Sequence, residues 1–90
     1  MSTTVRIVKT PDVLHGKPRL EGTRVGVFTV GELVRHRDWT TADIVEEFDI
    51  DDEQARAALA YYDDHPELME TLRAQKNARK ESLETATHTE

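Results

Sequence analysis

The chain has 90 residues, of which 37% are hydrophobic and only 6% are aromatic. This composition predicts one small domain whose limited core favours association with a second copy or with another protein. The absence of cysteine excludes disulfides and thiolate metal sites, and it favours the cytoplasm. No apolar run approaches the roughly 20 residues of a membrane helix, and the N-terminus has no signal-peptide core, so we expect neither membrane insertion nor secretion.

The net charge of −6 is unevenly distributed along the chain. Residues 1–37 carry seven basic and three acidic residues, whereas residues 38–70 carry one basic and twelve acidic residues. A polyanion should therefore contact the N-terminal third and avoid the middle of the chain. Only 4 of the 12 basic residues are lysine. The small share of lysine among the basic residues, in an acidic chain, is compatible with a salt-loving source and equally with an ordinary acidic protein.

The N-terminal segment has the pattern of a short β-ribbon. An alternation of apolar and polar residues predicts a strand over residues 4–8. Gly16 and Gly22 can adopt positive φ without steric cost. They therefore predict a hairpin or looped ribbon that turns Leu20 and Val25 inward.

Three helices are predicted by capping boxes, in which the N-cap side chain and the side chain three residues later each accept a backbone N–H. In chain order the pairs are Thr29 with Glu32, Thr40 with Asp43, and Asp51 with Gln54. The first helix should end near Arg37, and the third should end before Pro66, which cannot continue a helix. The apolar stripe of the third helix is formed by Ala55, Ala58, Leu59 and Tyr62.

Two short helices, a tight link and a longer third helix have the spacing of a helix-turn-helix unit. Residues 67–82 predict a fourth, polar helix, and residues 83–90 have the composition of a disordered tail. The expected fold class is mainly α. It is a helix-turn-helix domain of three to four helices, preceded by a short β-ribbon, and the ribbon and helix-turn-helix unit together span residues 1–66.

Three short motifs in this order resemble the domain-of-unknown-function 433 family: Gly16-Lys17-Pro18, Gly22-Thr23-Arg24 and Ala58-Leu59-Ala60-Tyr61. The resemblance covers roughly Ile7 to Pro66. It implies a small winged or homeodomain-like helix-turn-helix protein, and it further implies an antitoxin role, because some members pair with a PIN-like ribonuclease toxin. The chain departs from the pattern at Asp38, where relatives often carry glycine, although aspartate can adopt the left-handed conformation.

The third helix is a poor candidate for reading the major groove, because Asp51, Asp52 and Glu53 would meet the phosphates first. Its acidic first turn is explained more simply by the helix dipole. Strands and wings also bind DNA, and the N-terminal third is basic. The DNA-binding candidates are therefore Arg6, Lys9, Lys17, Arg19 and Arg24. The alternative is a solvated ribbon whose Arg24 pairs with an acidic helix of the same domain.

Neither metal chemistry nor catalysis is supported by the sequence. The four histidines have no ligand spacing, and the acidic residues have no histidine partner at a defined spacing. We therefore expect no cofactor, no metal and no enzymatic activity. An exposed tyrosine and the apolar positions of the fourth helix suit a protein interface. The interface candidates are Tyr61, Leu68, Met69 and Leu72.

The sequence therefore supports a non-catalytic antitoxin-like or regulatory helix-turn-helix protein in the cytoplasm. In this interpretation the chain forms a homodimer, binds a partner such as a PIN-like ribonuclease toxin, and contacts DNA through the basic ribbon. The alternative is a protein-binding or dimerisation module that does not bind DNA.

Overall fold

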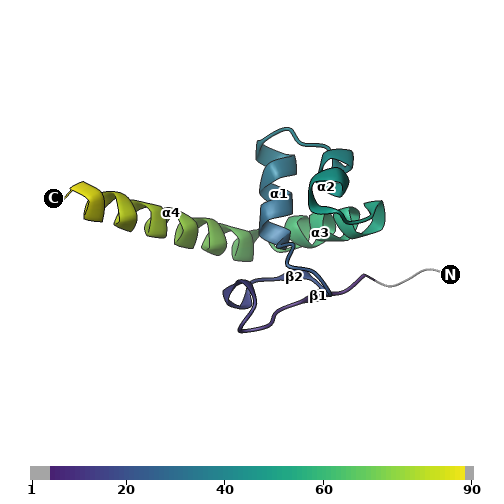
Figure 1. The fold of residues 1–90 in the computed structure, drawn as a ribbon, viewed down its shortest axis with the longest axis horizontal. Helices are drawn as coiled ribbons and strands as arrows, with labels where there is room; N and C mark the ends of the chain where they lie inside the picture. The colour runs from purple at the N-terminus through teal and green to yellow at the C-terminus, as the bar shows by residue number, and fades with distance from the viewer. Residues whose placement is uncertain (1–4, 89–90) are drawn as a thin grey trace.

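The computed structural model describes residues 5–88 and consists of a short β-ribbon followed by four helices (Figure 1). The expectation of a mainly helical domain with an N-terminal ribbon is confirmed. Helices α1 and α2 both pack against α3, and the ribbon lies beneath them. In chain order the elements are β1 (Ile7–Val8), a 3₁₀ turn at Leu14–Gly16, β2 (Arg19–Leu20), α1 (Val27–His36), α2 (Thr41–Phe48), α3 (Asp52–Asp64) and α4 (Pro66–His88).

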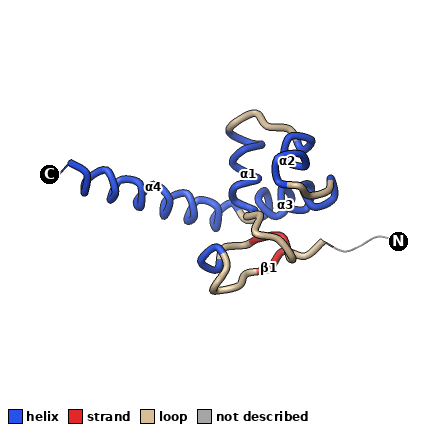
Figure 2. Tube along the Cα trace, viewed as in Figure 1, coloured by secondary structure: helices blue, strands red, loops and turns tan. Residues whose placement is uncertain are grey.

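The two strands of the ribbon are antiparallel, with Ile7 opposite Leu20, and most of this segment is loop (Figure 2). Gly16 and Gly22 have φ of 80° and 82°, as their placement in turns predicted. Leu20 is fully buried, which confirms its inward orientation. The strand pairing is less local than expected, because β1 pairs with β2 across the loop that contains the 3₁₀ turn.

Helix α1 begins at Val27, so the prediction of a capping box at Thr29 was wrong. The N-cap is Gly26, which has extended backbone angles and no side chain to accept a hydrogen bond. The Val27 N–H instead donates to the carbonyl oxygen of Pro18 at 3.0 Å, and the Val27 side chain is fully buried. Contact with the ribbon therefore determines where the helix starts.

The other two capping boxes are confirmed, at Thr40 for α2 and at Asp51 for α3. Asp38 has φ of 60°, which is the left-handed conformation that the turn requires in place of glycine. Asp49 ends α2 in the same conformation. The link between α2 and α3 is therefore short and fixed at both ends by local hydrogen bonds.

Helix α4 begins in the domain and then extends away from it (Figures 1 and 2). Met69 and Leu72 are buried against the core, whereas residues 74–78 are all exposed. We call residues 5–73 the head. The molecule measures 58 × 29 × 24 Å, and its long axis follows α4.

Two expectations for the C-terminal segment therefore differ from the structure. The packed domain extends beyond residue 66, because the first turns of α4 complete its core. The tail expected over residues 83–90 is helical as far as His88, and residues 89–90 lie outside the described residues. Residues 81–88 contain alanine, leucine and glutamate but no glycine or proline, so no helix-breaking residue interrupts α4. Among the described residues, no helix is long and apolar enough to cross a membrane.

Candidate partner-binding site

A hydrogen-bonded network of Tyr62, Glu32 and Arg73 fixes the base of α4 to the head. The Tyr62 hydroxyl donates to Glu32 Oε2 at 2.6 Å. Arg73 donates to Glu32 through Nε at 3.2 Å and Nη2 at 2.8 Å, and Nη2 also lies 3.0 Å from the Tyr62 hydroxyl. The network joins α1, α3 and α4, so it determines the direction in which α4 leaves the head.

The electrostatics of this network hold Glu32 in its charged form. The hydrogen bond from Arg73 is the largest cause of the lowered pKa of Glu32, and it outweighs partial burial, which acts in the opposite direction. His36 lies 3.5 Å from the same carboxylate and lowers its pKa further. Burial and the neighbouring carboxylate raise the pKa of Tyr62, so its hydroxyl remains a donor at neutral pH.

Gly31 allows the ring of Tyr62 to lie directly on α1. A Cβ atom built on Gly31 would overlap the Tyr62 ring. Gly31 is buried, and Tyr62 is 8% exposed. The close approach of α1 and α3 that this glycine permits brings the Tyr62 hydroxyl within reach of Glu32.

The four residues expected at a partner interface are in three different environments. Met69 and Leu72 are 2% and 5% exposed, so both belong to the core of their own chain, although Leu72 also lines a surface cavity. Leu68 is half-buried. Tyr61 is also half-buried, and its ring stacks on that of His65 with 3.9 Å between centroids. After Arg73, every residue of α4 as far as Ala78 is exposed, and we call the part of α4 beyond Arg73 its exposed part.

Arg19 forms hydrogen bonds within the ribbon, and these argue against its assignment as a DNA contact. Its Nη1 donates to the Thr23 carbonyl oxygen at 2.9 Å and its Nη2 donates to Thr10 Oγ1 at 3.0 Å. These bonds close the turn after β2. The guanidinium group therefore has little freedom to bind phosphate.

The other four basic candidates keep accessible side chains. Arg6, Lys9 and Arg24 are exposed, and Lys17 is half-buried. None of the four forms an ion pair with another described side chain. The proposed pairing of Arg24 with an acidic helix is therefore not present among the described residues.

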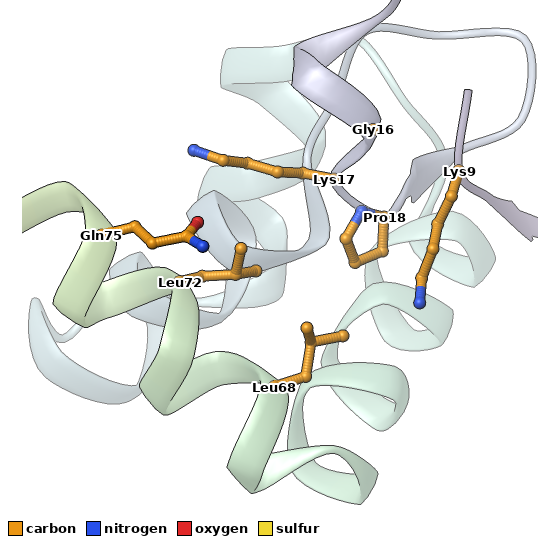
Figure 3. Close-up of a pocket in the computed structure, with 7 residues that line it drawn as sticks. All are labelled: Lys9, Gly16, Lys17, Pro18, Leu68, Leu72 and Gln75. Atoms are coloured by element: carbon orange, nitrogen blue, oxygen red, sulfur yellow. The ribbon is translucent and has the colours of Figure 1, made fainter. Parts of the chain in front are cut away.

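The structure joins the two sets of predicted site residues in one cavity. The cavity has a volume of about 240 Å³ and lies between the Gly16-Lys17-Pro18 motif and α4 (Figure 3). It is lined by two members of the basic set, two members of the apolar set and three further residues: Lys9, Gly16, Lys17, Pro18, Leu68, Leu72 and Gln75.

Sequence reasoning missed Gly31, Glu32 and Arg73. Glu32 was assigned to a capping box, and its partner Arg73 is 41 residues away, so no local spacing connects them. No cluster of three or more potential metal ligands occurs among the residues searched, which are those that the structure describes.

Comparison with protein families matches residues 7–62 to the family described as Protein of unknown function (DUF433). The match covers the ribbon and helices α1 to α3 up to Tyr62, and it ends before α4. Comparisons with curated proteins and with solved structures gave no match. Because the family profile covers more than half of the chain, the protein belongs to the DUF433 family.

Proposed function

We propose that this chain is a non-catalytic, antitoxin-like regulatory protein that binds a second protein through the exposed part of α4. The observation that carries the proposal is that α4 continues for fifteen residues beyond Arg73, and its residues 74–78 are all exposed. We propose a cytoplasmic location for this activity. The partner is a second copy of the chain or a toxin of the PIN-like ribonuclease class.

The stability of an isolated helix argues for a partner on this segment. Helices shorter than about 12–15 residues are marginal in water even when they are rich in alanine, because nucleation is costly. Residues 74–88 include asparagine, serine, histidine and two threonines, which are weaker helix formers than alanine. Packing against a partner would supply the stabilisation that the head does not provide.

The base of α4 is suited to presenting this segment in a fixed direction. Arg73 occupies the last turn before α4 leaves the head, and its two hydrogen bonds to Glu32 restrain that turn. Arg73 also lies over the ring of Phe28, 5.9 Å from the ring centroid. A helix held at its base loses less entropy on binding than a free peptide does.

Truncation after Ala78 tests the proposal, because it removes the last turns of α4 but retains the core residues Met69 and Leu72. Thermal melting of the shortened chain should remain close to that of the full chain. Light scattering should show loss of self-association if the partner is a second copy, and the candidate toxin should no longer co-purify if the partner is a toxin. Unchanged assembly and unchanged toxin binding would contradict the proposal.

DNA binding is the second candidate function, and the observation in its favour is the exposure of Arg6, Lys9 and Arg24 on the ribbon. The first turn of α3 carries exposed acidic residues, so the ribbon is the surface that suits a duplex better.

A matched pair of triple variants tests this function by fluorescence anisotropy with a duplex oligonucleotide. Binding should be lost in Arg6→Gln/Lys9→Gln/Arg24→Gln and retained in the control, Arg37→Gln/Arg56→Gln/Lys76→Gln. The control removes the same charge from exposed sites elsewhere. Affinity should also fall steeply with salt. Equal DNA binding by both variants would exclude the ribbon as the DNA-binding surface.

A further inference from the structure

We propose that the cavity between the Gly16-Lys17-Pro18 motif and α4 binds a short segment of the partner protein that carries an apolar side chain next to a carboxylate. This inference rests on the proposed function, because it assigns a second contact to the partner that α4 engages, and it takes that partner to be a different protein from this chain. It also gives a role to a family motif that the turn of the ribbon alone does not explain.

The cavity combines an apolar floor with a basic rim. Pro18 is buried and Leu72 is 5% exposed, while Leu68 is half-buried at the opening. Lys9 and Lys17 reach toward this floor from two sides in Figure 3. No acidic residue is present among the described residues that line the cavity. An apolar side chain would therefore be buried on the floor while its neighbouring carboxylate pairs with the ammonium group of Lys9 or of Lys17.

The backbone of the motif fixes the position of Lys17. Gly16 adopts φ of 80°, which favours glycine, and Lys17 is extended with φ of −73° and ψ of 150°. Pro18 favours this extended conformation of the residue before it. In Figure 3 the Lys17 side chain reaches across the opening toward Gln75 of α4. Gln75 adds a side-chain amide that can donate to or accept from a peptide backbone.

The size and polarity of the cavity select the class of ligand. A volume of about 240 Å³ lies below the roughly 300–1,000 Å³ typical of small-molecule sites, so it suits one or two side chains better than a cofactor. The phosphates of a nucleic-acid backbone would pair with the two lysines. They would leave the apolar surface of Pro18, Leu68 and Leu72 without an apolar partner. Complementarity to both parts of the cavity therefore favours an acidic–apolar peptide.

An NMR titration of the ¹⁵N-labelled full chain tests this assignment. The probe is an acetylated and amidated octapeptide of alternating glutamate and leucine, and the comparison peptide replaces leucine with serine. Backbone shifts should change at Lys17, Leu72 and Gln75 with the first peptide, and affinity should fall about tenfold or more in Lys9→Gln/Lys17→Gln. The control Arg37→Gln/Arg56→Gln, at two exposed positions outside α4, should bind as the wild type does.

Four outcomes would overturn the proposal. The first is the absence of saturable changes in chemical shift up to about 1 mM peptide, a concentration that corresponds to the dissociation constant of a weak complex. The second is equal binding of the serine peptide, which would indicate charge attraction alone. The third is the same shifts with a duplex oligonucleotide, which would assign the lysines to phosphate. The fourth is the same shifts on raising protein concentration without peptide, which would assign the cavity to a second copy.

A negative result in the peptide titration can be distinguished from a negative result in the truncation test of the proposed function. The titration detects the cavity in the free chain and does not require any contact to the part of α4 beyond Ala78. If truncation after Ala78 abolishes assembly but the full chain does not bind the peptide, the proposed role of α4 is supported. Only the proposal that the cavity binds a partner segment is then ruled out.

Discussion

The ring of Tyr62 lies against Gly31 so closely that no side chain larger than hydrogen fits between α3 and α1 at this point. The same tyrosine donates its hydroxyl proton to Glu32, which in turn accepts from Arg73 of α4. One glycine therefore controls the spacing of two helices and, through the network above it, the direction of a third.

Gly31→Ala should lower the free energy of unfolding by about 1–3 kcal/mol, as overpacking of a core does. At an exposed helical position the same substitution would stabilise the chain by about 1 kcal/mol, because alanine is the better helix former. A loss of stability would therefore show that the close contact with Tyr62 outweighs helix propensity. Thr29→Ala, at an exposed site in the same helix, is the control and should change stability by less than about 0.5 kcal/mol. Urea denaturation measures both. A Gly31→Ala chain as stable as the wild type would mean that Tyr62 does not lie on this glycine.

Acid should destabilise the chain partly through Glu32. The folded state holds the pKa of Glu32 below its ordinary value of 4.5, so the unfolded state takes up a proton first as pH falls. The stabilisation is complete above that value and is lost as pH falls through the lower, folded pKa.

The variant Glu32→Gln should therefore lose stability less steeply than the wild type as pH falls below about 4.5. Denaturation at a series of pH values measures these slopes. Glu46→Gln, at an exposed position of α2, should retain the wild-type slope. Identical slopes in the Glu32→Gln chain and the wild type would contradict the role of the Arg73–Glu32 pair.

Replacement of Arg19 by alanine should destabilise the ribbon by about 1–3 kcal/mol, because Thr23 and Thr10 lose their hydrogen-bond donor. Arg24→Ala removes the same charge from an exposed position and should have little effect on stability. Thermal melting compares the two. If the two variants melt alike, Arg19 is not a structural residue and its assignment to DNA binding becomes open again.

Leu59→Ala should cost about 2–5 kcal/mol, because Leu59 is only 9% exposed in the apolar stripe of α3. Leu68→Ala should cost less, since Leu68 is half-buried. Chemical denaturation gives both values. A smaller loss at Leu59 than at Leu68 would show that the register of α3 is different.

The features that sequence predicted correctly depend on neighbouring residues. The caps of α2 and α3 join residues three apart, at Thr40 and at Asp51, and the left-handed turn at Asp38 is a property of one residue. The apolar stripe of α3 follows from helical periodicity. Each of these features is determined within one or two turns of chain.

The features that sequence analysis missed depend on contacts between distant segments. The start of α1 is set by the hydrogen bond from Val27 to Pro18, and a local capping box at Thr29 was preferred in error. Arg19 carried the same signal as any exposed arginine, and only the fold shows that its guanidinium closes a turn. The burial of Met69 depends on where α4 crosses the head, which no periodicity specifies.

The central claim is that α4 beyond Arg73 contacts another protein chain, and site-specific photocrosslinking tests it most directly. A benzophenone amino acid at Ala74 or Ala78 of the full chain should crosslink to one protein in source-cell extract, either a second copy or a different chain identified by mass spectrometry. The control position is Ala42, an exposed alanine on α2. Unlabelled full chain should compete for the crosslink, and the chain truncated after Ala78 should not. No crosslink from α4, or equal crosslinking from Ala42, would contradict the claim.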